Sequence, residues 1–130
     1  MKFKEKAKNI AFAVHDDKNT ELIEWSYFNK EMLNNHHITA CGNAGNILQG
    51  TLETTVVKLP EAPVGGCNLL SKHISDGKID ILIFFWNDTK EQLQKNDVQT
   101  LLSAALEANI IVAHNKISAE YILSSPFIYN

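Results

Sequence analysis

Short runs of apolar residues alternate along the chain with longer segments in which apolar positions recur every three or four residues. The short runs have the length of strands buried on both faces of a sheet, and the longer segments have the spacing of amphipathic helices. The predicted strands are 9–15, 37–41, 54–59, 79–86 and 110–115, and the predicted helices are 19–35, 67–78, 97–109 and 118–125, with a turn that opens a short helix over 42–50.

This alternation predicts the fold class. Strands that alternate with helices form right-handed crossovers and a parallel sheet. We therefore expect an α/β fold, a three-layer, Rossmann-like doubly wound domain with a mainly parallel five-stranded sheet. The run 79–86 is apolar almost throughout and belongs inside the sheet. Residues 1–130 form a single domain in this interpretation, and residues 1–8, with four lysines, form a basic N-terminal arm.

Local signals set the expected helix ends. Gly77 stops the helix 67–78, while Asp97 and Ser118 are the expected N-caps of the last two helices. His36 and His37 precede a strand and are expected at the surface. In a parallel α/β sheet, ligands bind at the carboxyl ends of the strands. Candidate site residues should therefore lie just after each predicted strand.

Composition narrows the chemistry. The chain carries a net charge of −3 and twelve basic residues, all of them lysines. Nucleic acid and anionic membranes are therefore not expected as partners, and no arginine is present to clamp a phosphate. Two cysteines are too few for a disulfide scaffold, and no secretory signal or membrane-spanning run is found. We expect a cytoplasmic protein without a cofactor.

Several segments together resemble methylglyoxal synthase. They are "HDDK" after the first strand, "GNAGN" after the second, "PVGGC" after the third, "KIDILIFFW" and "DVQTLLSAALEANIIVAHN", and the resemblance spans roughly residues 8 to 126. It implies a homohexamer that converts dihydroxyacetone phosphate to methylglyoxal and phosphate, with a carboxylate that removes a proton next to the carbonyl. The same fold also serves as a regulatory effector-binding domain in carbamoyl-phosphate synthetase, so the fold alone does not imply catalysis.

The resemblance assigns the first two loops to the site. His15 and Asp16 match a histidine–aspartate pair of the family. The family's phosphate-binding lysine falls at Asn19, although Lys18 stands one residue earlier. The phosphate loop, Thr-Gly-Thr-Thr-Gly in the family, is replaced by Cys41, Gly42, Asn43, Ala44 and Gly45. Both glycines remain, so a backbone cradle is expected to survive, while all three hydroxyls are lost.

The later motifs are altered as well. Gly65, Gly66 and Cys67 stand where the family has Gly-Gly-Asp, so Cys67 replaces the catalytic aspartate. A histidine that orients the substrate falls at Gln94, whereas the aspartate three residues later is kept as Asp97. The chain is also expected to be shorter than the family at its C-terminus, where the family has a phosphate-contacting arginine.

These replacements favour a diverged protein that lacks the usual dihydroxyacetone-phosphate lyase activity and binds a small phosphorylated or anionic metabolite. The alternative is an active synthase with a rearranged site. Asp16 or Asp97 would then serve as the base, and Lys18 with the loop amides would hold the phosphate. A homo-oligomer is expected in either case, on resemblance alone.

A third alternative is a different enzyme that uses Cys67 as a nucleophile or metal ligand. The resemblance brings Cys41, Cys67 and His15 to one pocket, where they would bind a metal ion or where the two thiols would form a disulfide. The plainer interpretation is that the Cys67 thiol fills the space of a lost carboxylate. Similarly, Asp97 would only cap a helix, and His15 would only close a strand end.

Overall fold

The computed structural model describes residues 7–60, 68–86 and 96–129. Within them lie β1 (Asn9–Val14), η2 (Asp16–Lys18), α1 (Asn19–Phe28), α2 (Lys30–Leu33), β2 (His37–Cys41), α3 (Asn43–Thr51), β3 (Val56–Leu59), α4 (Asn68–Ser75), β4 (Ile81–Phe85), α6 (Asn96–Ala108), β5 (Ile111–Ala113), α7 (Lys116–Ser124) and η3 (Pro126–Tyr129). The sheet has the order β3-β2-β1-β4-β5, and every neighbouring pair is parallel. The expected fold class is confirmed.

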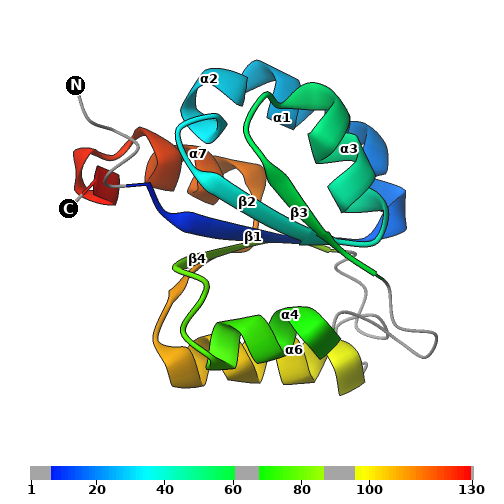
Figure 1. Ribbon diagram of the computed structural model, residues 1–130, viewed down its shortest axis with the longest axis vertical. Coiled ribbons are helices and arrows are strands. Elements are labelled where there is room, and N and C mark those ends of the chain that lie inside the picture. Colours follow the sequence, from blue (N-terminus) through cyan, green and yellow to red (C-terminus); the bar gives the residue numbers. More distant parts are fainter. Residues whose placement is uncertain (1–6, 61–67, 87–95, 130) are drawn as a thin grey trace.

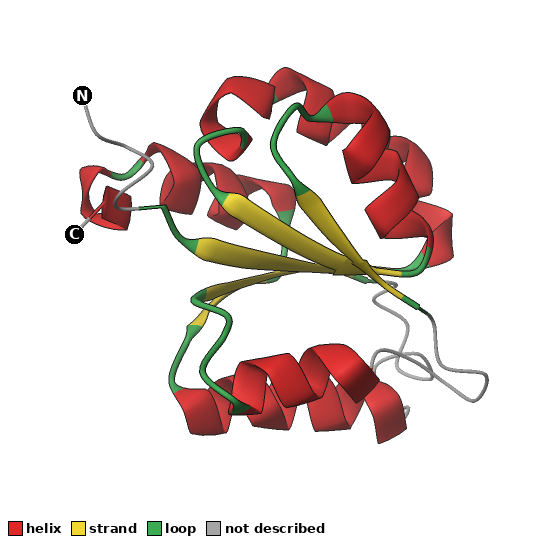
Figure 2. Cartoon of the chain, in the orientation of Figure 1, coloured by secondary structure: helices red, strands yellow, loops and turns green. Residues whose placement is uncertain are grey.

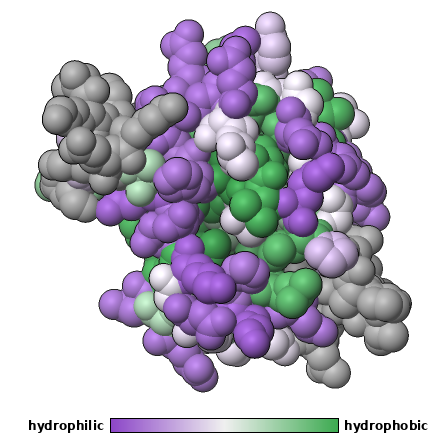
Figure 3. Space-filling model, in the orientation of Figure 1, coloured by the Kyte–Doolittle hydropathy of each residue, from purple (hydrophilic) through white to green (hydrophobic). Residues whose placement is uncertain are grey.

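Helices cover both faces of the sheet (Figures 1 and 2). The helices α1, α2, α3 and α7 lie on one face, and α4 with α6 lies on the other. On the face in view, apolar side chains gather at the level of the sheet, between the polar side chains of the two helical layers (Figure 3). The three layers follow from strands that are apolar on both sides and therefore need a helical cover on each.

Alternation along β4 separates two hydrophobic cores. Ile81, Ile83 and Phe85 pack with the helices of the first layer, whereas Leu82 and Phe84 pack with α4 and α6. All five residues of this strand are buried, because β4 lies inside the sheet between β1 and β5. The prediction of an interior strand from its apolar run is confirmed.

The helix predicted over 19–35 is divided in two. The α1 helix ends at Phe28 and α2 begins at Lys30, with Asn29 between them. The Asn29 side chain is buried and its Nδ2 donates to the Trp25 carbonyl at 2.9 Å. The same carbonyl accepts from the Asn29 backbone amide at 3.0 Å, so Asn29 is tied to the end of α1 through both its backbone and its side chain. Apolar periodicity does not reveal this role.

Two of the expected helix caps are wrong. The α7 helix is capped by Asn115, whose side-chain oxygen accepts from the Ser118 N–H at 2.8 Å. The α6 helix begins at Asn96, so Asp97 lies in its first turn instead of at the N-cap. The expected stop at Gly77 is confirmed, since Gly77 follows α4 with a φ of +77°. Glycine adopts that conformation without the strain of a side chain.

His36 is buried, contrary to expectation. Its exposed fraction is 1%, while His37 is exposed as expected. The Lys8 amide donates to His36 Nδ1 at 3.0 Å, and the imidazole stacks on the Tyr129 ring with centroids 5.5 Å apart. Burial, as the largest cause, and the nearby charges of His37 and Lys8 together lower the pKa of His36 to about 4. Separately, no helix in the described part of the chain is long and apolar enough to cross a bilayer.

Candidate functional site

The carboxyl ends of β1, β2 and β4 meet at one edge of the sheet. Register brings the ends of the neighbouring strands together, with Val14 beside Phe85 and Phe12 beside Ala40. The backbone continues this pairing beyond β1, because the His15 amide donates to the Phe85 carbonyl at 2.9 Å. The carboxyl edge therefore holds His15, Asp16 and the loop 41–45, which are the described residues that follow β1 and β2.

The His15 side chain is held by Asp17, which the sequence analysis did not assign to the site. His15 is the N-cap of η2, where its Nδ1 accepts from the Asp17 amide at 3.2 Å and also contacts the Asp17 carboxylate. When Nδ1 carries the proton it donates to that carboxylate, and Nε2 is then the acceptor nitrogen. The imidazole edge meets the Trp86 ring, with centroids 5.1 Å apart and planes at 85°. The histidine is thus oriented by Asp17 and Trp86 rather than by Asp16.

Asp16 joins the first loop to the second. Its carboxylate is exposed and accepts from the Asn43 side-chain amide at 3.4 Å. The two loops are contributed by neighbouring strands, so this contact agrees with the expectation that both face one site. Asp16 and Asn43 are the two polar side chains that lie together beside the start of α3.

Lys18 and Asn19 lie beside α1. The Lys18 ammonium is 3.8 Å from the Glu21 carboxylate, which is also 3.8 Å from Lys116 Nζ on α7. Asn19, at the position of the family's phosphate-binding lysine, begins α1 and keeps its Oδ1 buried without a hydrogen-bond partner. A lysine in this place would put an ammonium where Asn19 now has a neutral amide.

The loop after β2 is shaped by Gly42. This residue has φ 64° and ψ −143°, a conformation open to glycine and strained for other residues. It is the N-cap of α3 and gives that helix end no side-chain cap. The Gly45 amide donates to the Gly42 carbonyl at 3.2 Å. The preceding amides of Asn43 and Ala44 have no acceptor within the helix, and they offer an anion-binding end.

Gly45 and Ala44 have packing roles. A Cβ at Gly45 would lie 3.0 Å from Cγ of Lys58 and 3.4 Å from the Ala40 carbonyl oxygen, so this glycine lets α3 lie close against β2 and β3. Ala44 is 2% exposed and belongs to the core of the first layer. Only the backbone of Ala44 is therefore available to a ligand. Of the two glycines in this loop, Gly42 makes the turn.

Cys41 ends β2 and faces the opposite core. It is 5% exposed and disulfide-bonded, and the sequence contains one other cysteine, Cys67. Cys67 lies outside the described residues, as do Gly65, Gly66 and Gln94. A metal site or a nucleophile at these positions would require both sulfurs in the reduced state. Among the residues that the structure describes, no three His, Cys, Asp or Glu side chains are grouped to hold a metal ion.

An aromatic row extends from His15 along this edge. The Trp86 ring stacks on Phe84, with centroids 5.3 Å apart and planes at 6°, and Phe84 meets the edge of His114 at 6.3 Å. The Trp86 Nε1 atom is buried without a partner. The sequence interpretation had noted Trp86 only as a strand end. One feature of the sequence could have pointed to Trp86. It is an indole, which has one hydrogen-bond donor, at the carboxyl end of an otherwise apolar strand.

The fold and this edge define a class of protein. A doubly wound parallel sheet whose strand ends meet an uncapped helix N-terminus is typical of α/β domains that bind small phosphorylated or anionic metabolites. No protein-family model matches the chain, so the comparison rests on individual relatives and solved structures.

The relatives and the solved structure are all methylglyoxal synthases. A methylglyoxal synthase from Photorhabdus laumondii is 42% identical over 120 residues, covering 92% of this chain and 79% of the relative. One from Coxiella burnetii is 40% identical over 119 residues, covering 92% of this chain and 83% of the relative. The crystal structure of a methylglyoxal synthase from Elizabethkingia anophelis has a TM-score of 0.83 at 31% identity, covering 96% of this chain and 82% of that chain. The chain belongs to the methylglyoxal synthase family.

Proposed function

We propose that this protein binds a small phosphorylated metabolite of the dihydroxyacetone phosphate class between the loops after β1 and β2, and that it converts this ligand to methylglyoxal slowly or not at all. The observation that carries the binding proposal is the uncapped N-terminus of α3, opened by Gly42. Its free amides and the positive end of the helix dipole favour a phosphate. Asp16, at 3.4 Å from Asn43, then faces the ligand as a hydrogen-bond acceptor.

The slow reaction follows from the side chains that the sequence supplies. By resemblance, Cys67 stands at the place of the catalytic base, and a thiol with its ordinary pKa is mostly protonated at neutral pH. The hydroxyls expected around the phosphate are replaced in the 41–45 loop, and the chain has no arginine. Loss of a general base or of an electrostatic stabiliser each costs a factor of about 10²–10⁴ in rate.

An active synthase with Asp16 as base is the second candidate. It is supported by the exposure of the Asp16 carboxylate beside Asn43, and by relatives that carry the name methylglyoxal synthase at 35–42% identity. Asp97 is the other carboxylate expected in this role, but its side chain lies outside the description. A third candidate, a thiol- or metal-dependent enzyme at Cys67, requires the reduced protein, since Cys41 is disulfide-bonded in this structure.

Two measurements test these candidates. Calorimetric titration of the reduced and oxidised protein with dihydroxyacetone phosphate measures binding, and a colorimetric assay measures methylglyoxal. We expect binding together with a rate near that of buffer, and we expect Cys67→Asp to raise the rate while Cys67→Ala does not. The binding proposal is wrong if no heat is detected at millimolar ligand.

The same colorimetric assay decides between the first candidate, a slow or inactive protein, and the second, an active synthase. If the wild-type chain is fast, Asp16→Asn should abolish the rate in the active-synthase candidate, while Asp76→Asn should leave it unchanged. Asp76 is a matched control because it is exposed and follows α4, outside the loops that form the site. A fast wild type whose rate survives Asp16→Asn would eliminate Asp16 as the base and would direct attention to Asp97.

A further inference from the structure

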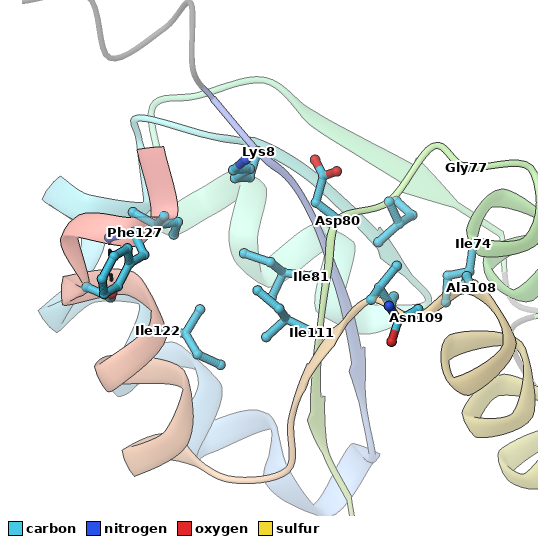
Figure 4. A pocket seen from close by; sticks show the side chains of 14 residues that line it. Lys8, Ile74, Gly77, Asp80, Ile81, Ala108, Asn109, Ile111, Ile122 and Phe127 are labelled. Atoms are coloured by element: carbon cyan, nitrogen blue, oxygen red, sulfur yellow. Dashed lines mark hydrogen bonds between the residues drawn. The ribbon is translucent and has the colours of Figure 1, made fainter. Parts of the chain in front are cut away.

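A large cavity lies at the amino edge of the sheet, opposite the carboxyl edge that carries His15 and Gly42. Its volume is about 610 Å³, within the range of small-molecule sites. It is bordered by the starts of β4 and β5 and by the ends of α4, α6 and α7, with η3 along one side (Figure 4). None of the residues considered above for phosphate binding lines it.

Isoleucines make up half of the residues that line the cavity. Ile81 is almost fully buried at 1% exposure, whereas Ile111, its partner on β5, is 50% exposed. In Figure 4 both side chains lie in the centre of the cavity, with Ile122 and Phe127 across from them. Burying half-exposed apolar surface is favourable by about 25 cal/mol per Å², so an apolar body is the natural occupant of this region. The remaining isoleucines of the wall are Ile74, Ile79, Ile110 and Ile128.

Hydrogen-bond acceptors surround the mouth. The Asp80 carboxylate accepts from the Asn9 amide through Oδ2 at 2.8 Å, while its Oδ1 has no hydrogen-bond partner within the described part of the chain. The cavity also borders the C-terminal ends of three helices, at Gly77 after α4, at Asn109 after α6 and at Ser125 after α7. Each such end carries a partial negative charge.

Among the described residues that line the cavity, Lys8 carries the one positive charge. Lys8 lines the cavity, and Figure 4 places its side chain on the side nearer Phe127, with Asp80 beside it toward β4. Within the described part of the cavity wall, one full carboxylate and three helix C-termini outnumber this cation. The charge distribution therefore favours a ligand with a positive head group over one with a negative head group.

We propose that this cavity binds a small amphipathic amine, with the apolar body among the isoleucines and the ammonium group at Asp80. The Asp80 Oδ1 atom and the helix C-terminal carbonyls accept the three N–H bonds that an ammonium donates. A strand from another chain is disfavoured as the occupant, because β5 offers only three residues for pairing. The proposal is independent of phosphate binding at the opposite edge.

The test uses three probes with one apolar body and different head groups: 3-phenylpropylamine, 3-phenylpropanol and 3-phenylpropanoate. Binding is followed by the amide NMR signals of Ile111 and Ser125, with Gly42 and Asn43 at the opposite edge as internal controls. We expect the amine to bind about tenfold more tightly than the carboxylate, with the alcohol between them, and with no shift at Gly42.

Two variants locate the interaction. Asp80→Asn keeps an oxygen for the Asn9 amide and removes the charge, so it should weaken the amine about three- to fivefold and leave the alcohol unchanged. Ile111→Trp fills the cavity from a half-exposed position and should abolish binding of all three probes, with circular dichroism as the check of folding. The proposal is overturned by equal affinities for the three probes, by binding that survives Ile111→Trp, or by no shift at about 10 mM probe.

Discussion

The burial of His36 makes a quantitative prediction about stability in acid. The Lys8 amide donates to Nδ1 at 3.0 Å, so the ring proton is on Nε2, which is buried without a partner. Protonating Nδ1 breaks this hydrogen bond and leaves a buried cation stacked on Tyr129. The folded state therefore resists the proton, and the pKa of His36 falls from 6.5 to about 4.

The direction of the effect follows from proton linkage. Between pH 6.5 and about pH 4 the unfolded chain binds a proton at His36 that the folded chain does not bind. The contribution of His36 to stability is thus intact above its unfolded pKa, is lost as the pH falls, and is level again below the folded pKa. At about 1.4 kcal/mol per pKa unit, the whole loss amounts to about 3 kcal/mol.

Urea unfolding, followed by tryptophan fluorescence from about pH 8 to about pH 4, measures this loss. His36→Asn places an amide oxygen where Nδ1 accepts the Lys8 amide, and it does not titrate. The free energy of unfolding of wild type should therefore fall about 3 kcal/mol further than that of His36→Asn over this range. His37→Asn is the matched control and should keep most of the wild-type slope, because burial is the largest cause of the shift. Parallel curves for wild type and His36→Asn would refute the reasoning.

Two further predictions concern helix ends and glycines. Gly77→Ala should lower the free energy of unfolding by about 1–2 kcal/mol, because its φ of +77° disfavours a side chain. Gly50→Ala, within α3 and with open space where a Cβ would stand, should raise the free energy of unfolding by up to about 1 kcal/mol. Urea titrations that shift both variants in one direction would contradict this account. Asn115→Ala should cost about 1 kcal/mol by removing the cap of α7, whereas Ser118→Ala should cost much less. Equal losses for these two variants in the same titrations would restore Ser118 as the cap.

Much of the fold was predictable because its signals are local. The apolar run that forms β4 predicted an interior strand, and its alternating side chains feed both cores. The order of strands and helices predicted the parallel sheet. The positions of His15, Asp16 and the 41–45 loop then followed from the rule that sites lie at strand carboxyl ends. Gly65, Gly66 and Cys67 lie outside the described residues, so their place in the site stays a prediction.

Other parts of the site depended on contacts that no local pattern contains. Asn43 reaches Asp16 across 27 positions of sequence, and Trp86 meets His15 from another strand. The same holds for Gly45, which the resemblance places in a phosphate cradle and whose packing contacts come from another strand. The structure gives it a packing role, because Lys58 of β3 lies against it. A prediction from one segment does not include such neighbours.

The sequence by itself therefore determined which faces of each element are apolar, and with them the layers, the parallel sheet and the edge where the site is expected. The tertiary structure decided which polar groups meet, from the burial of His36 under Tyr129 to the isoleucine cavity at the amino edge. The physical reason is the separation along the sequence of the residues that interact. Periodicity is set by backbone geometry within a few residues, whereas burial, pKa and cavity shape are set by side chains that folding brings together.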